Sequence, residues 1–234
     1  MDNKKLIPCL GLTMLLSTPA VAELYVTEQI LASQDNTLID DPEGARSNGS
    51  GPFIFAGSTG GNLGGGIRRG LVHFDLEGVI PEEARIEEVN LHLYVDRGGP
   101  GEIRLYRVLQ DWGEGASCKN GGSGAPSQTG DATWIHTFYD TSTWDAPGAD
   151  RSRPAGNARV NIDMPGMYTW SSNRMKRDVQ LWTEQPGTNF GWLLVGDERS
   201  PQSVVAFASR EALTCEGAPT GLPQPMLEVT YSLP

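Results

Sequence analysis

The stretch from Arg68 to Val95 constrains the fold most, because it contains two apolar runs joined by a polar, proline-containing connection. In the second run, apolar residues alternate with polar ones, at Val89, Leu91, Leu93 and Val95. An alternation with a period of two places one set of side chains on one face of a strand. Pro81 has no amide hydrogen to donate and fixes its own φ, so 78–84 is predicted to connect two strands. Further sheet elements must cover the apolar face of this pair.

Short apolar segments between Gly- and Pro-rich turns continue along the chain. Further strands are predicted at 24–32, 52–56, 102–109, 131–139, 159–164, 190–195, 203–209 and 226–233. Residues 35–41 are interpreted as an acidic turn. One helix is predicted at 171–185, because Met175, Val179 and Trp182 share a helical face. Many short strands and little helix predict an all-β fold, a jelly-roll-like antiparallel β-sandwich with one short helix.

Nine segments carry a resemblance to a known family. They read RGLVHFDL at 69–76, IP at 80–81, ARI at 84–86, LHL at 91–93, WGEG at 112–115, GDATWIHTFY at 130–139, NFGWLL at 189–194, ASRE at 208–211 and PMLEVTY at 225–231. Together they resemble the secreted DNRLRE-type, disaggregatase-related domains from about residue 35 to residue 231, although the literal string DNRLRE is absent. This resemblance implies a β-sandwich similar to carbohydrate-binding modules.

The N-terminus has the pattern of a secretory signal peptide. Lys4 and Lys5 precede an apolar run, and Ala20-Val21-Ala22 supplies the small residues of a cleavage site. We therefore expect residues 1–22 to be removed and residues 23–234 to form one domain that is secreted, periplasmic or on the cell surface. No other stretch approaches the roughly 18 apolar residues of a membrane helix, so no membrane span is expected in the mature chain.

The chain is strongly acidic, with a formal net charge of −11, and removal of the signal peptide would take away two lysines and one aspartate. This charge disfavours nucleic acid and anionic membranes as partners. It also disfavours a strongly anionic polysaccharide, unless a local basic patch or a cation intervenes. The sequence leaves the oligomeric state open.

Two cysteines, Cys118 and Cys215, lie outside the predicted signal peptide. Exported proteins meet an oxidising compartment, so we predict that these residues form a disulfide. It would close a loop of about a hundred residues, which the chain-entropy model values at roughly 4–5 kcal/mol. The alternative is a pair of free thiols.

Aromatic residues near two long loops predict a sugar-contacting surface. The loops at 113–130 and 140–157 bracket the predicted strand 131–139. Indole faces can stack on the C–H faces of sugar rings. The predicted ligand-binding residues are Trp112, Trp134, His136, Tyr139 and Trp144. The alternative is that the tryptophans pack beneath the loops, as Trp182 and Trp192 are expected to pack in the core.

Acidic side chains near the start of the mature chain suggest a structural Ca²⁺ site. Asp35, Asp40 and Asp41 lie close together in sequence, with Glu43 just after them. Carboxylate oxygens are preferred Ca²⁺ ligands. The spacing matches no known calcium loop, and a solvated acidic turn is the preferred interpretation.

Other charged residues are interpreted as structural. His73 and His92 lie within predicted strands, with no second His or Cys at metal-binding spacing. Buried arginines need partners, and one buried ion network is predicted from Arg68, Arg69, Arg210 and Glu211.

These observations predict a secreted, non-catalytic module that binds a polysaccharide or a cell-surface glycan. A structural or adhesive extracellular protein is the alternative. A polysaccharide-degrading enzyme ranks third, because no nucleophile motif is present. His136 and Tyr139 also fall on opposite faces of the predicted strand 131–139.

Overall fold

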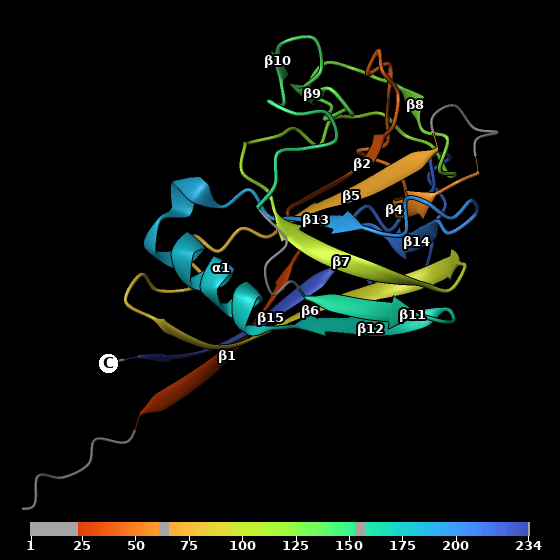
Figure 1. Ribbon diagram of the computed structural model, residues 1–234. Helices are drawn as coiled ribbons and strands as arrows, with labels where there is room; N and C mark the ends of the chain where they lie inside the picture. Colours follow the sequence, from red (N-terminus) through yellow and green to blue (C-terminus); the bar gives the residue numbers. More distant parts are fainter. Residues whose placement is uncertain (1–22, 61–65, 153–157, 234) are drawn as a thin grey trace, which may run out of the picture.

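The structure, a computed structural model, describes residues 23–60, 66–152 and 158–233. The predicted signal peptide at 1–22 lies outside the described residues. The main element is an 11-stranded antiparallel sheet that curls so that its two halves face each other, as Figure 1 shows. This is consistent with the predicted all-β sandwich.

One half of the sheet is built around the longest strand. It contains β1 (Leu24–Leu31), β15 (Met226–Leu233), β6 (Arg85–Gly98), β14 (Val205–Ala208) and β12 (Gly166–Ser171). The alternation predicted for Val89–Val95 is confirmed, since its four apolar members are buried. The pairing of β15 with β6 shifts its register between Glu88 and Ile86, and Ile86 joins the same core. Such a bulge adds one residue to one strand and changes which side chains face inward.

The other half contains β2 (Gln34–Ile39), β5 (Ile67–His73), β13 (Trp192–Val195), β7 (Gly101–Arg107) and β11 (Arg159–Ile162). β4 (Phe53–Ser58) pairs with both β14 and β5 and so joins the halves. The apolar side chains of both halves form the main core. Two strands, β2 and β12, were not predicted, because β2 carries a polar sequence and β12 follows directly after a turn.

The helix α1 (Asn173–Glu184) covers one side of the sandwich, followed by a short 3-10 helix, η1 (Pro186–Thr188). The Ser172 hydroxyl caps α1 by accepting a hydrogen bond from the Met175 amide. Met175, Val179 and Trp182 are buried, so the predicted helical face is confirmed. The Trp182 ring lies 4.6 Å from that of Trp192, between centroids.

A layer of loops covers the outer face of β5, β13 and β7. It includes two small antiparallel strand pairs, β3 (Arg46–Ser47) with β8 (Ala125–Pro126) and β9 (His136–Phe138) with β10 (Ser142–Thr143). A second apolar cluster lies beneath it and joins Leu71 and Leu193 of the sheet to Trp112, Trp134 and Trp144 of the loops. Of the nine-residue strand predicted at 131–139, only His136–Phe138 forms a strand. Thr133 turns the chain there, because its hydroxyl accepts hydrogen bonds from the amides of Ile135 and His136.

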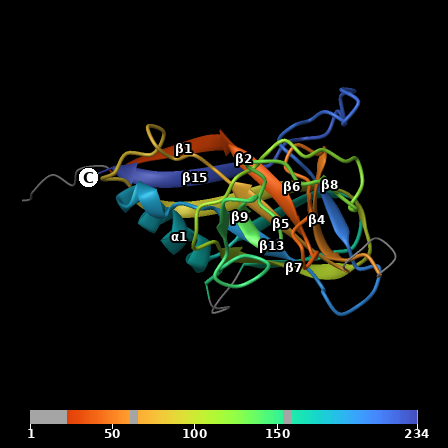
Figure 2. The same ribbon diagram turned by 90° about the horizontal axis from the view of Figure 1, so that it is seen from above.

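The predicted disulfide is confirmed between Cys118 and Cys215, whose Cα atoms are 5.6 Å apart. It joins the loop layer to the connection between β14 and β15. The two ends of the domain also meet, because β1 pairs with β15 along its whole length, as Figure 2 shows from above. Within the described residues, the structure contains no helix that is both long and apolar enough to span a membrane.

Candidate functional site

The predicted tryptophans do not present open faces to solvent. Trp112, Trp134 and Trp144 are exposed by only 2%, 9% and 5% of their surface. The indole N–H of Trp112 donates to the carbonyl of Phe190, and that of Trp144 donates to the carbonyl of Thr133. The Arg69 guanidinium lies 4.6 Å above the Trp134 ring. These contacts agree with the alternative interpretation, in which the rings pack beneath the loops.

His136 and Tyr139 are more exposed and lie together. Their rings are 5.2 Å apart in an edge-to-face arrangement, and His136 Nδ1 is 2.9 Å from the Thr133 hydroxyl. The expectation that they occupy opposite faces is therefore wrong, because the strand is too short to impose alternation. Of the five predicted ligand-binding residues, these two are the ones that a ligand reaches without moving the loop layer.

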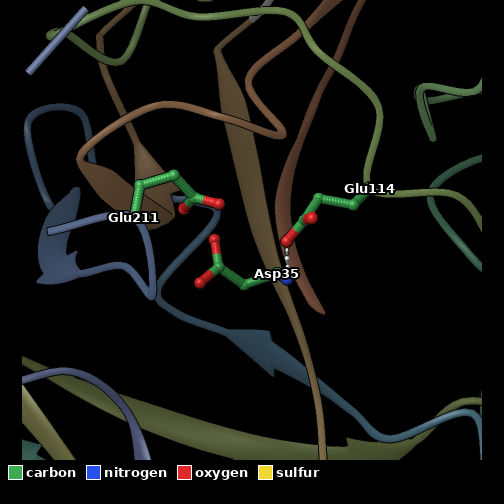
Figure 3. Close-up of side chains that lie close together, drawn as sticks. All are labelled: Asp35, Glu114 and Glu211. Atoms are coloured by element: carbon green, nitrogen blue, oxygen red, sulfur yellow. Dashed lines mark hydrogen bonds between the residues drawn. The ribbon is translucent and has the colours of Figure 1, made fainter. Parts of the chain in front are cut away.

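Three carboxylates from distant parts of the chain meet beside the start of β2. The side chains of Asp35, Glu114 and Glu211 point toward one another (Figure 3), and each places one oxygen within 4.8 Å of the others. Asp35 belongs to β2, Glu114 to the loop layer and Glu211 to the connection after β14. The predicted grouping of Asp35 with Asp40 and Asp41 is corrected, because neither of those residues belongs to this cluster.

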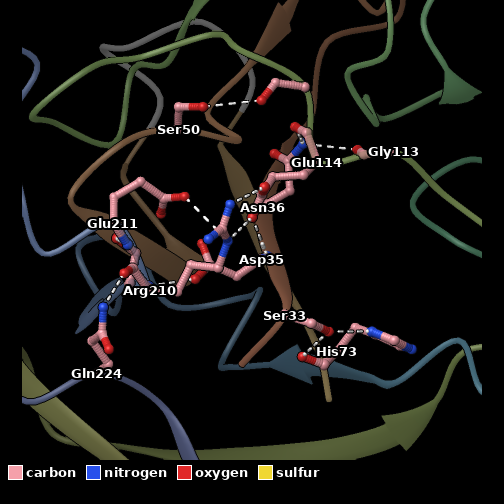
Figure 4. Close-up of polar contacts among 12 residues, drawn as sticks. Ser33, Asp35, Asn36, Ser50, His73, Gly113, Glu114, Arg210, Glu211 and Gln224 are labelled. Atoms are coloured by element: carbon pink, nitrogen blue, oxygen red, sulfur yellow. Dashed lines mark hydrogen bonds and ion pairs between the residues drawn. The ribbon is translucent and has the colours of Figure 1, made fainter. Parts of the chain in front are cut away.

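Arg210 holds the carboxylate cluster together (Figure 4). Its Nε and Nη2 atoms lie 2.6 Å from the two oxygens of Glu114, and its backbone amide donates to Asp35 Oδ2 at 2.7 Å. Nε is also 3.4 Å from Glu211. The predicted single network with Arg68 and Arg69 is wrong, since Arg69 pairs with Glu198 on another part of the sheet.

Burial perturbs the acids of the cluster. It raises the pKa of Asp35 well above its usual range, and the charge of Glu211 raises it further. Burial, and then the charge of Glu114, raise the pKa of Glu211 to about 7. Glu211 Oε2 is buried and has no hydrogen-bond partner. The cluster therefore holds protons up to near-neutral pH, because ionising all three acids in this place is unfavourable.

The carboxylate cluster has ligand atoms suited to a hard cation such as Ca²⁺. However, Arg210 already engages both oxygens of Glu114. A cation would be left with Asp35 and Glu211, and it would meet the positive charge of the guanidinium. The arrangement fits a structural ion network better than a metal centre.

A polar cleft of about 520 Å³ lies on the outer face of β7, beside the loop layer. Glu102, Arg104 and Tyr106 point to this side, while Ile103 and Leu105 point into the main core. Val195 of β13 and the following segment 196–199 complete its floor and wall. The alternation of apolar and polar residues in β7 indicates that one of its faces is polar. The sequence could not show that the loops leave this face uncovered.

The side chain of Arg151 lines this polar cleft on β7, which we call the sheet-face cleft. Its guanidinium lies 4.7 Å from the centroid of the Tyr106 ring. Its Nη1 is buried and has no hydrogen-bond partner. Burial, followed by repulsion from Arg69, lowers the pKa of Arg151, although an arginine stays charged at neutral pH.

Comparison with known proteins assigns no family. No family model matches the chain, and no curated protein is significantly similar to it. The resemblance to DNRLRE-type domains therefore rests on the sequence segments alone.

Proposed function

We propose that this chain is an extracellular, non-catalytic β-sandwich that binds a glycan in the sheet-face cleft on β7. The observation that carries the proposal is the concave polar surface itself, which has a size typical of ligand sites. The resemblance to carbohydrate-binding modules and the disulfide support the same proposal.

The side chains of the sheet-face cleft suit sugar hydroxyl groups. A hydroxyl both donates and accepts hydrogen bonds. The cleft is lined by donors and acceptors together, on Glu102, Arg104, Arg151, Asp197, Glu198 and Arg199. Glu102 already pairs with Arg104, and Glu198 with Arg69, so a hydroxyl would share these groups with their partners. Carboxylates and guanidinium groups are planar and can each engage two neighbouring hydroxyls. The three positive and three negative side chains balance, so we expect a neutral glycan rather than a polyanion.

Recognition in the sheet-face cleft would depend more on hydrogen bonds than on stacking. Tyr106 is the aromatic residue there, and it is exposed by only 8%, with Arg151 lying over its ring. Loss of one charged hydrogen-bonding group typically costs about 1.5–3 kcal/mol, which corresponds to roughly a tenfold to hundredfold loss of affinity.

A glycan array probed with the purified protein, with and without Ca²⁺, tests the proposal. We expect neutral oligosaccharides to bind, and Arg104→Ala and Arg151→Gln to weaken that binding by about tenfold or more. Arg85→Ala is the matched control, because Arg85 is exposed on the other half of the sheet. An array without ligands, or cleft variants that bind like the parent, would refute the proposal.

A structural or adhesive role is the second candidate, because of the edge strand β1. Within the described residues, β1 pairs only with β15. Leu24, Tyr25 and Leu31 on this strand are exposed by 61%, 58% and 55%. An unpaired edge can pair with another chain. Light scattering over a range of protein concentrations distinguishes the two candidates. Self-association that Thr27→Lys abolishes would favour this role, whereas a monomer that binds glycans would favour the first.

A further inference from the structure

The strand β1 forms a free edge of the large sheet. Among the described strands it pairs with β15 alone, and no other strand lies beyond it (Figure 1). We propose that β1 pairs antiparallel with β1 of a second copy of this chain, across a two-fold axis at Thr27, and so joins two sandwiches into a closed dimer. The inference rests on the structural or adhesive role proposed above as the second candidate, because it names the partner and the register of the same edge strand.

The sequence of β1 lacks the features that normally keep a sheet edge from pairing with another chain. Those features are short strand length, prolines, bulges and charged side chains, above all lysine. Residues 24–31 contain no lysine, arginine, proline or glycine, and their pairing with β15 runs through all eight residues without a register shift. At the other end of the sheet, β11 has only four residues and carries the exposed Arg159. Of these two edges, β1 is therefore the one that suits a partner strand.

Half of the backbone groups of β1 point away from β15. The amide of Ala32 donates to the carbonyl of Pro225, so these two residues occupy a hydrogen-bonded position of the ladder. In an antiparallel pair, such positions alternate with positions whose N–H and C=O groups point outward. Because the register does not shift, the outward groups belong to every second residue from Tyr25 to Leu31. A copy of β1 that runs in the opposite direction presents the matching donors and acceptors.

Exposed apolar side chains are concentrated on the same strand. Of the eight exposed large hydrophobic side chains among the described residues, three lie on β1: Leu24, Tyr25 and Leu31. Leu24 lies on the same face of the strand as Val26 and Ile30, which contribute to the main core. With the axis at Thr27, Leu24 lies opposite Ile30 of the second copy. The pairing therefore covers an exposed leucine and continues the apolar face of one sheet into the other.

Charge selects the register of this pairing. Two registers overlap nearly the whole strand, with the two-fold axis at Thr27 or at Glu28. An axis at Glu28 places the two glutamates directly opposite each other, and like charges in that arrangement are destabilising. An axis at Thr27 places Glu28 opposite Val26 of the second copy. The hydroxyl groups of Thr27 and Thr230 are 2.8 Å apart, so this register also continues a row of threonines from one sheet into the other.

Sedimentation velocity of the protein from about 1 to 200 µM tests for the dimer, because interfaces that bury less than about 1,200 Å² belong to weak complexes. We expect monomer at the low end of this range and dimer at the high end. Thr27→Lys brings two lysines opposite each other at the axis and should weaken dimerisation by about tenfold or more. Val79→Lys is the matched control, because it places the same charge on an exposed apolar residue outside β1, and it should dimerise like the parent.

Single cysteine substitutions test the register. Residues that face each other at a hydrogen-bonded position have Cα atoms about 5.5 Å apart, which suits a disulfide. Thr27→Cys should therefore form a covalent dimer under mild oxidation, detected by non-reducing gel electrophoresis. Glu28→Cys is the matched control. Its two copies lie diagonally, about 7–8 Å apart, which exceeds the usual Cα separation of a disulfide, so this variant should stay unlinked.

The outcomes separate this inference from the role on which it rests. A parent that stays monomeric throughout, or Thr27→Lys and Val79→Lys proteins that dimerise equally, would overturn both. A dimer in which Glu28→Cys links and Thr27→Cys does not would overturn the register and leave the role in place, as would assemblies that grow beyond two copies. The glycan proposal fails separately, because Arg104→Ala changes the sheet-face cleft and should leave the dimer unchanged.

Discussion

Arg210 brings charged side chains from three parts of the chain into one cluster. Its amide and guanidinium contact Asp35 and Glu114, and Glu211 lies beside them. Removing Arg210 would leave these acids without their main counter-charge, and an unpaired buried charge is strongly destabilising. The sequence analysis interpreted residues 35–41 as an acidic turn, whereas Asp35 is buried in β2. The partners that permit its burial lie far away along the chain.

The cluster predicts how stability depends on pH. The folded pKa of Glu211 is about 7, above its ordinary value of 4.5. A raised carboxyl pKa stabilises the folded state most at low pH, and this contribution is lost as the pH rises between the two values. Glu211→Gln removes the titration. We expect the variant to raise Tm by roughly 2–4 °C at about pH 8, and by less at about pH 5. Thermal melts across this range give the measurement, and parallel pH profiles of parent and variant would contradict the expectation.

The helix α1 shows what local sequence can specify. Its cap, its apolar face and its end at Pro186 are all encoded within a few residues. The segment 131–139 shows the opposite case, since its alternating pattern suits a strand, but tertiary contacts favour a turn. The Asp131 carboxylate accepts hydrogen bonds from the amides of Ser117 and Gln128 there. Those partners lie in the loop that the sequence predicted at 113–130, but no local pattern showed that this loop packs against Asp131.

Truncation of Trp182, which α1 buries in the core, tests the packing of this helix. Trp182→Ala should cost on the order of 3–5 kcal/mol of unfolding free energy, because it removes a fully buried ring and leaves a cavity. Urea denaturation measures this loss. Arg177→Ala is the control, since Arg177 is exposed on the same helix, and it should change stability by less than about 0.5 kcal/mol. A loss below about 1 kcal/mol for Trp182→Ala would mean that the helix packs differently.

The packing of Trp144 beneath the loop layer also leads to a prediction. Trp144 lies in the cluster beneath the loops, where its N–H bonds to Thr133. Trp144→Ala should therefore lower Tm by several degrees, at a cost of about 3–5 kcal/mol, and leave the glycan affinity of the folded protein unchanged. Thermal melts and binding assays on the same sample separate the two effects. A stable variant that has lost binding would restore this tryptophan to the ligand surface.

The molecule as a whole is two sheet halves, a helix and a loop layer held by one covalent link. The sequence predicted the sandwich from the alternation of apolar residues and the helix from its cap and apolar face. It predicted the Cys118–Cys215 disulfide because exported proteins meet an oxidising compartment. The position of the sheet-face cleft could not be predicted, since it depends on how far the loop layer extends across β7. The carboxylate cluster was equally hidden, because its members come from three separate segments.

The disulfide is open to a direct test. Mass spectrometry without reductant should show the loss of two hydrogens, and alkylation of the native protein should label neither Cys118 nor Cys215. Reduction should lower the free energy of unfolding by about 2–5 kcal/mol, measured by urea denaturation with and without dithiothreitol. A Cys118→Ala, Cys215→Ala variant that matches the reduced parent serves as the control. Reduced and oxidised forms of equal stability would show that the loop layer does not depend on this link.

The pairing of the first strand with the last has a consequence for how the chain is made. β1 is the first of the described strands to be synthesised, and its only partner among them, β15, is the last. Until then β1 is an unpaired strand with exposed leucine and tyrosine side chains, a segment prone to aggregation. This half of the sheet therefore completes only after β15 has left the ribosome, and a ribosome stalled shortly before residue 226 should hold a chain whose β1 segment is still open to proteases.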